Sequence, residues 1–129
     1  MNTGHGARRL ILVVEDNQDL RDAVCAVLED EGYPVRGAAN GRQALEALAK
    51  GPVPCLMLLD LMMPVMDGWQ VLEALPVEAA PAARFPIIVL SAARDRDARH
   101  PQVRRSLAKP VRIDVLLEAV QEYCGPPGS

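Results

Sequence analysis

Three short segments of the chain are apolar without interruption, which is typical of strands buried on both faces of a parallel sheet. They read LILVV at 10–14, CLMLLD at 55–60 and PIIVL at 86–90. Two weaker segments, YPVRGA at 33–38 and SLA at 106–108, are candidates for flanking strands. The pattern therefore predicts five strands.

The segments between these strands carry apolar residues at helical spacing. Helices are expected over 17–31, 41–50, 67–75 and 113–123. Asp67 is a natural N-cap, Pro76 ends the third of these helices, and a glycine follows each of the other three.

Strands that alternate with helices predict βαβ units, and hence an α/β fold with helices on both faces of a parallel sheet. We expect about five helices. The 129 residues suit one domain, over 10–124, with a flexible arm at 1–9 and a flexible tail, GPPGS, at 125–129.

Composition narrows the class of protein. Half of the residues are hydrophobic but only four are aromatic, so the core is aliphatic. The net charge is −3, and the arginines of 94–105 alternate with Asp95 and Asp97, so we expect a solvated face and no nucleic-acid partner. The apolar run LILVV is too short for a signal segment or a membrane span.

The three cysteines lie far apart in the sequence and form no CxxC pair. Cys25 and Cys55 sit in apolar contexts, where we expect them to act as small core residues. An odd number without metal-ligand spacing favours a reducing compartment, and we expect a cytoplasmic protein.

Polar residues follow the predicted strands at one edge of the sheet. Glu15 and Asp16 follow the first strand, Asp60 ends the third, Ser91 ends the fourth and Lys109 follows the fifth. Ligands bind at the carboxyl ends of strands in open α/β sheets, so these side chains should converge on one site.

Three neighbouring carboxylates repel one another, by about 4 kcal/mol for each pair at 4 Å and an effective dielectric constant near 20. Such a cluster requires a cation, and hard oxygen ligands suit Mg²⁺. A carboxylate–Mg²⁺ site with a lysine and a hydroxyl beside it can stabilise a phosphoryl group during transfer, and an aspartate can be the nucleophile in that reaction.

Simpler interpretations exist for each residue taken alone. The Glu15–Asp16 pair suits a helix N-terminus, Ser91 could be an N-cap, and Lys109 could be a surface lysine. Asp60 is the hardest to explain structurally, because a lone charge in CLMLLDLMMP is costly unless something pairs with it. It is therefore the best candidate for the nucleophile.

The segments VVEDN, LLDLMMPVMDG, VLSA and LAKP together resemble the receiver domain of two-component response regulators, the CheY-like superfamily. The resemblance spans about residues 10–123. It implies a flavodoxin-like (βα)5 fold and phosphorylation by a histidine kinase or a histidine phosphotransfer protein.

Matched position by position, the resemblance assigns roles to individual residues. Asp60 would accept the phosphoryl group, and Asp16, Glu15 (through water) and the backbone carbonyl of Met62 would hold Mg²⁺ together with it. Ser91 would follow the phosphoryl group, Lys109 would pair with its oxygens, and the bond from Lys109 to Pro110 would be cis. Met62 and Ala93 would tune access of the hydrolytic water.

Two departures from the family lie on the output side. Ser106 occupies the position where the family usually has a Tyr or Phe switch residue. The stretch between Ser91 and Lys109 is about one helical turn shorter than usual, arginine-rich and broken by Pro101, so the fourth helix should be short or irregular. We expect a signal that leaves through reorganisation of residues 94–105, or a phosphate relay or sink.

The leading function is thus a phosphoryl-accepting signalling domain rather than an enzyme, one that catalyses only its own phosphotransfer and slow autodephosphorylation. Its downstream partner is unknown and no membrane is involved. The alternative is a pseudo-receiver, an interaction module that works without phosphorylation. A metal-dependent phosphohydrolase is a third class that also uses an aspartate nucleophile. It would typically have a second carboxylate two residues after the first, where this chain has Met62, so this class is disfavoured.

Overall fold

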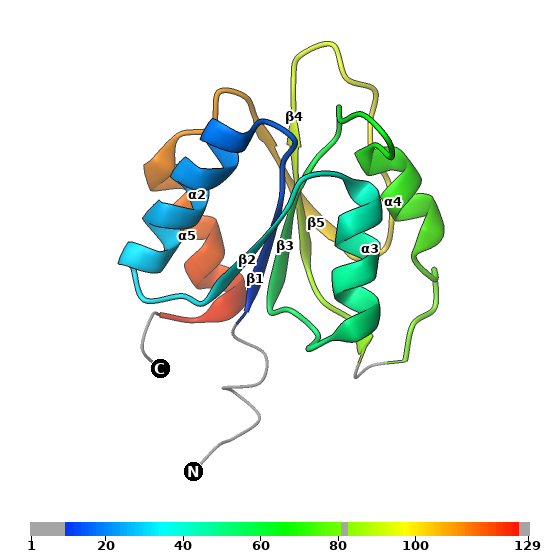
Figure 1. Cartoon of the computed structure of the whole chain (residues 1–129), viewed down its shortest axis with the longest axis horizontal. Coiled ribbons are helices and arrows are strands. Elements are labelled where there is room, and N and C mark those ends of the chain that lie inside the picture. Colours follow the sequence, from blue (N-terminus) through cyan, green and yellow to red (C-terminus); the bar gives the residue numbers. More distant parts are fainter. Residues whose placement is uncertain (1–9, 81–82, 127–129) are drawn as a thin grey trace.

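The computed structural model describes residues 10–80 and 83–126, which form a five-stranded parallel sheet between two layers of helices (Figure 1). Its strands lie in the order β2-β1-β3-β4-β5. They are β1 (Ile11–Val14), β2 (Val35–Ala38), β3 (Leu56–Asp60), β4 (Ile87–Ser91) and β5 (Val103–Ala108). The predicted α/β class, with five parallel strands, is confirmed.

The strands predicted from unbroken apolar runs occupy the middle of the sheet. Every residue of β1 and β3, and all of β4 except Ser91, is buried because helices cover both faces. The edge strands β2 and β5 are partly exposed, which explains their weaker apolar patterns. β5 begins at Val103, three residues before the predicted start.

Helices cover both faces of the sheet (Figure 1). Helices α2 (Gln18–Asp30) and α5 (Ile113–Cys124) pack on one face, where Leu28, Leu116 and Val120 are buried. Helices α3 (Gly41–Lys50) and α4 (Gly68–Ala74) pack on the other, around Ala44, Val71 and other aliphatic residues. The core is aliphatic, as the composition predicted.

Polar side chains mark where three of the helices begin. The side chains of Asn17, Asn40 and Asp67 accept hydrogen bonds from backbone N–H groups in the first turns of α2, α3 and α4. At α4 the side chain of Gln70 completes a capping box. The four helices agree with their predicted bounds to within one residue at each end.

No helix forms between Ser91 and Val103, a stretch that the structure describes throughout, so the expectation of a short or irregular fourth helix there was wrong. Residues 92–102, which we call the strap, instead run along α4. Trp69 Nε1 donates to the Asp97 carbonyl at 3.2 Å, and the Arg96 guanidinium lies 4.5 Å from the centre of the Trp69 ring. The strap lacks the apolar stripe with which a helix would pack on the sheet. Its contacts with α4 hold it in place instead.

Cys55 does not act only as a small core residue, because it forms a disulfide with Cys124. The two residues are 69 positions apart in sequence, but α5 packs over β3 and brings their Cα atoms to 5.5 Å. Cys25 is a free, partly buried thiol whose pKa is raised by burial. The pairing removes the basis for inferring a reducing compartment from unpaired cysteines.

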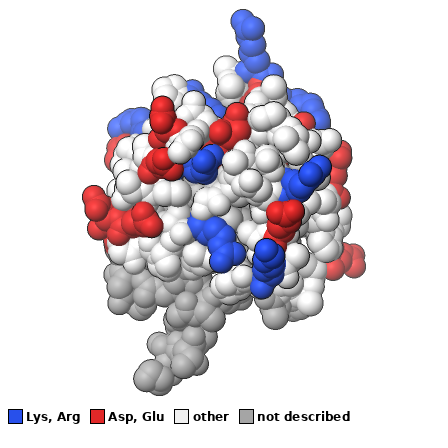
Figure 2. Space-filling view, in the orientation of Figure 1, with Lys and Arg blue, Asp and Glu red and all other residues white. Residues whose placement is uncertain are grey.

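The surface of the described chain carries charges of both signs. Acidic and basic side chains are interspersed over the face drawn in Figure 2. None of the helices that the structure describes has the length and apolar character needed to cross a bilayer. The predicted arm at 1–9 and the last three residues of the predicted tail lie outside the described residues.

Candidate functional site

The carboxyl ends of the strands bring the predicted site residues to one edge of the sheet. Asp60 is the last residue of β3 and lies in register with Leu90 of β4. Glu15 and Asp16 follow β1, which pairs with β3 on its other side, and Lys109 follows β5. The site therefore spans the crevice where the strand order reverses.

Lys109 is the cation at the centre of this site. Its Nζ lies 2.5 Å from Asp60 Oδ1 and 3.7 Å from Glu15 Oε1. Both carboxylates are buried, with Asp60 only 1% exposed, so solvent screens these interactions weakly. The ammonium thus offsets part of the negative charge that burial makes costly.

One lysine does not balance three carboxylates. Glu15, Asp16 and Asp60 each place an oxygen within 4.8 Å of the others. The buried oxygens Glu15 Oε1 and Asp60 Oδ1 share the single Lys109 ammonium as their cationic partner within the described residues. Carboxylate oxygens held this close together, with one ammonium between them, are suitable ligands for a hard divalent cation.

The pKa values of the site show the same imbalance. Burial raises the pKa of Glu15 to about 7, and the charge of Asp60 acts in the same direction. Burial also raises the pKa of Asp60, although Lys109 opposes the shift. Burial by itself would lower the pKa of Lys109, but its contacts with Asp60 and Glu15 outweigh this and the pKa is raised.

Neighbouring backbone and side-chain groups hold the site residues in place. Glu15 Oε2 accepts a hydrogen bond from the Asn17 N–H at 3.1 Å, and Arg21 Nη1 donates to the Glu15 carbonyl at 2.8 Å. The Lys109 N–H donates to the Ser91 carbonyl at 2.9 Å, and the peptide bond from Lys109 to Pro110 is cis. The lysine is thereby tied to the end of β4.

The loop from β3 to α4 packs closely behind Asp60. The Gly68 N–H donates to the Leu61 carbonyl at 2.9 Å, and a Cβ atom at Gly68 would lie 2.6 Å from the Asp60 carbonyl oxygen. Val65 in this loop has φ of 71°, a conformation that β-branched residues rarely adopt. The motif implied this loop, but sequence reasoning assigned no role to Gly68 or Val65.

Ser91, the last residue of β4, meets Ser106 of β5. Their hydroxyl oxygens lie 3.3 Å apart, and either can be the donor. The Met62 side chain is exposed in the loop after Asp60, and Ala93 is exposed in the strap. His100, for which no role was predicted, anchors the strap: its Nε2 donates to the Leu75 carbonyl at 3.3 Å.

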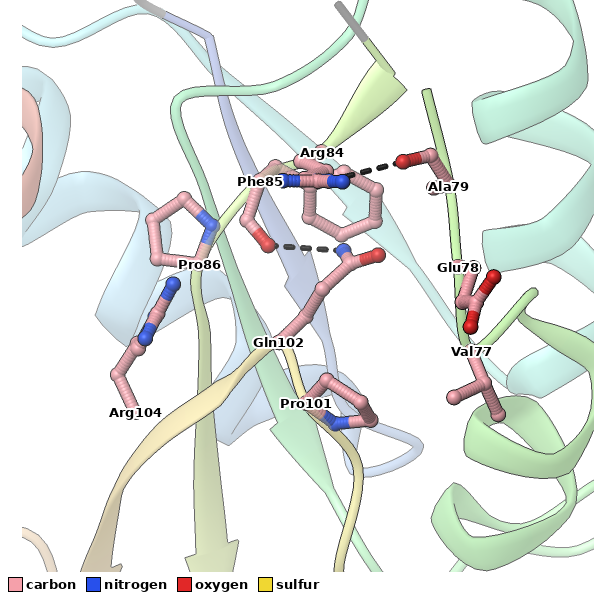
Figure 3. A pocket seen from close by; sticks show the side chains of 9 residues that line it. All are labelled: Val77, Glu78, Ala79, Arg84, Phe85, Pro86, Pro101, Gln102 and Arg104. Atoms are coloured by element: carbon pink, nitrogen blue, oxygen red, sulfur yellow. Dashed lines mark hydrogen bonds between the residues drawn. The ribbon is translucent and has the colours of Figure 1, made fainter. Parts of the chain in front are cut away.

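A cavity of about 390 Å³ lies away from the site, at the amino ends of β4 and β5 (Figure 3). Phe85 and Pro86, which precede β4, line it together with Arg84, Pro101 and Gln102. The Arg84 side chain donates to the Ala79 carbonyl and that of Gln102 to the Phe85 carbonyl. These polar groups hold the ends of the strap and of β4, far along the strands from Asp60.

Comparison with known proteins gives a family. The family described as response regulator receiver domain matches residues 11–121. An uncharacterized 14.6 kDa protein of Leptolyngbya boryana is 36% identical over 118 residues, which cover 88% of each chain. Sporulation initiation phosphotransferase F of Bacillus subtilis is 33% identical over 117 residues, covering 88% of this chain and 91% of that protein.

Some relatives are much longer than this chain. The matched segment spans 7% of a hybrid signal transduction protein of Dictyostelium discoideum, at 36% identity, and 49% of a transcriptional regulatory protein of Escherichia coli, at 35% identity. The family thus occurs both in proteins of about this length and as one part of larger proteins.

Solved structures agree with the sequence relatives. A response regulator receiver protein from Pseudomonas putida is 33% identical with a TM-score of 0.76, covering 90% of this chain and 98% of that one. The receiver domain of a sensor histidine kinase from Pseudomonas aeruginosa, which has a magnesium ion in its active-site cleft, is 29% identical with a TM-score of 0.76, covering 92% and 99%. The chain described here belongs to the family of response regulator receiver domains.

Proposed function

We propose that this domain accepts a phosphoryl group on Asp60 from a phosphorylated histidine of a histidine kinase or a histidine phosphotransfer protein. The observation that carries the proposal is the buried Asp60 carboxylate, held against Lys109 within a cluster of three carboxylates at the ends of adjacent strands. Buried carboxylates that outnumber the cations beside them are costly in a purely structural role, whereas binding Mg²⁺ and a phosphoryl group explains why they are there.

In the proposed reaction an Asp60 oxygen attacks phosphorus as the P–N bond of the phosphohistidine breaks, and an acyl phosphate forms. Lys109, already 2.5 Å from Asp60, would contact the oxygens of the transferred group and offset their charge. The Ser91 hydroxyl would donate a hydrogen bond to the same group. No other enzymatic activity is assigned to the chain.

We assign a Mg²⁺ site to Glu15, Asp16, Asp60 and the backbone carbonyl of Met62. The fit rests on the three carboxylate oxygens within 4.8 Å and on two buried oxygens, Glu15 Oε1 and Asp60 Oδ1, that share one ammonium. A bound Mg²⁺ would neutralise the cluster and stabilise negative charge on the phosphoryl oxygens. The magnesium ion of the similar Pseudomonas aeruginosa receiver supports this assignment.

The partner and the location belong to the same proposal. A phosphodonor kinase is supported by relatives that include a sensor histidine kinase of Ectopseudomonas mendocina, 36% identical over 113 residues. We place the phosphotransfer in the cytoplasm. We propose that the signal leaves through the strap rather than a helix, or that the domain passes the phosphoryl group on.

Incubation with acetyl phosphate and Mg²⁺ tests the proposal. We expect one phosphoryl group per chain, stable in acid and labile in base, and absent from an Asp60→Asn variant and from samples with a chelator. A pseudo-receiver, the competing function, would form no adduct and bind no Mg²⁺. That result would refute the proposal.

A further inference from the structure

The strap leaves an open cavity next to Ser91. It has a volume of about 250 Å³ and is lined by Leu61, Val89, Ser91, Ser106 and strap residues 95–99. Neither Asp60 nor Lys109 lines it. Ser91, the hydroxyl proposed to follow the phosphoryl group, therefore borders the cavity in this structure.

Ser106 holds the Ser91 hydroxyl on this side. The contact of 3.3 Å between the two Oγ atoms is the hydrogen bond that each hydroxyl makes within the described part of the chain. Ser106 lies on β5, where it pairs in register with Val89 of β4, so its side chain reaches the same side of the sheet as Ser91. A serine is short enough to leave the cavity open.

The backbone around Ser91 is fixed, which confines adjustment to the side chain. Ser91 pairs with Ala108 in the sheet, and its carbonyl accepts the Lys109 N–H at 2.9 Å. The next residue begins a turn in which the Ala92 N–H donates to Asp95 Oδ2 at 2.8 Å. Rotation about the Cα–Cβ bond of Ser91 is the motion that these contacts leave free.

We propose that Ser106 is a positioning residue whose hydroxyl holds Ser91 in a resting orientation toward the cavity, and that Ser91 must leave it to bind a phosphoryl group on Asp60. This inference rests on the proposed function. Where Ser91 is the donor, its single hydrogen cannot serve Ser106 and the phosphoryl group at once. Where Ser106 is the donor, the contact still holds Ser91 Oγ on the side of the cavity, which neither Asp60 nor Lys109 lines.

The size of the effect follows from the geometry. A distance of 3.3 Å is long for an O–H···O hydrogen bond, and Ser106 is exposed, so the interaction is weak. Removing it should favour the phosphoryl-bound state about two- to fivefold, toward the lower end of what hydrogen-bond deletions give.

The test is the affinity for beryllofluoride, a phosphoryl mimic, measured by titration calorimetry in the presence of Mg²⁺. Ser106→Ala should bind it about two- to fivefold more tightly than the natural chain. Ser106→Thr keeps the hydroxyl and should bind as the natural chain does. In a Ser91→Ala background, Ser106→Ala should have no effect, because the partner hydroxyl is already gone.

The outcomes separate this inference from the proposed function. If the natural chain binds beryllofluoride no better than Asp60→Asn does, the proposed function fails and the inference fails with it. If binding depends on Asp60, the inference alone is overturned by an unchanged affinity in Ser106→Ala, by a gain that persists without the Ser91 hydroxyl, or by an equal gain in Ser106→Thr.

Discussion

At the scale of single residues, the site combines a charge excess with burial. Glu15 and Asp60 are 3% and 1% exposed, yet one ammonium serves both. The raised pKa of each carboxyl follows from this arrangement. Without a bound cation the carboxyls of Glu15 and Asp60 therefore bind protons more readily than free carboxyls do. The free energy of unfolding should then depend on pH.

The first prediction concerns the pH dependence of stability in the presence of a chelator. Because the pKa of Glu15 is raised from 4.5 to about 7, its contribution to stability is present below pH 4.5 and lost as pH rises through 7. The free energy of unfolding from Glu15 should fall by up to about 3 kcal/mol across this window.

Urea denaturation at a series of pH values measures this effect. Glu15→Gln should flatten the slope between pH 4.5 and 7, since glutamine does not titrate. Added Mg²⁺ should reduce the slope as well, because it binds the ionised carboxylates. Equal slopes in the natural chain and in Glu15→Gln would contradict the assigned pKa.

Val65 provides a second prediction at this scale. Its φ of 71° strains a β-branched residue, and its side chain is 66% exposed, so little packing is lost on truncation. Val65→Gly should raise the free energy of unfolding by about 1 kcal/mol, the strain relieved less the added chain entropy of glycine.

Val77→Gly is the matched control for Val65→Gly. Val77 is also exposed, at 69%, but it is not among the described residues with positive φ. Here glycine should lower the free energy of unfolding by about 0.5–1 kcal/mol. Chemical denaturation compares the two variants, and a loss of stability at both positions would disprove the strain argument.

At the scale of elements, the regular strands and helices were predictable and the exceptions have physical causes. Unbroken apolar runs and polar caps are local signals, so the three central strands and all four helices were placed correctly. The path of the strap depends on the distant Trp69, and the Cys55–Cys124 bond depends on α5 crossing β3. Such contacts between remote segments leave no periodic pattern in the sequence.

The candidate site was predictable to a similar extent. The rule that ligands bind at the carboxyl ends of parallel strands predicts Glu15, Asp16, Asp60 and Lys109 as site residues, and the structure brings these four together. The hydrogen bond between Ser91 and Ser106 was not predictable, because that contact depends on the register of β4 against β5.

The approach of α4 to β3 gives a third prediction. A Cβ atom at Gly68 would meet the Asp60 carbonyl oxygen at 2.6 Å and Leu61 Cα at 2.8 Å, and backbone atoms cannot swing aside. Gly68→Ala should therefore lower the free energy of unfolding by about 2–3 kcal/mol. It should also slow phosphorylation, because Asp60 lies on the displaced segment.

Gly37→Ala serves as the comparison for Gly68→Ala. Its nearest contact would be Arg21 Cδ at 3.2 Å, part of a flexible side chain that can move. We expect a change of less than about 1 kcal/mol at this position. Thermal or urea unfolding of both variants measures the difference, and equal costs would show that the close approach at Gly68 is relaxed elsewhere.

At the scale of the whole molecule, the sheet holds the site residues in place. The strap differs from the helix that the family resemblance led us to expect between β4 and β5. The strap connects Ser91 at the site to Trp69 on α4 through a cation–π contact and hydrogen bonds. A change at Ser91 can thus reach the outer surface through the strap, without a helix between β4 and β5.

Hydrogen exchange tests this route for the signal. With beryllofluoride and Mg²⁺, we expect altered exchange in residues 92–101 and little change across 103–123. Asp60→Asn should show neither change. Altered exchange across 103–123, with none in 92–101, would show that the signal leaves through β5 and α5 instead.

Asp60 is the residue that we propose becomes phosphorylated, and its product can be identified chemically. Treating the acetyl phosphate product with borohydride, which reduces an acyl phosphate to an alcohol, labels the acceptor for mass spectrometry. We expect residue 60, and no other residue, to be converted to homoserine, and only when Mg²⁺ is present. Reduction at Glu15 or Asp16, or none in a fully folded sample, would contradict it.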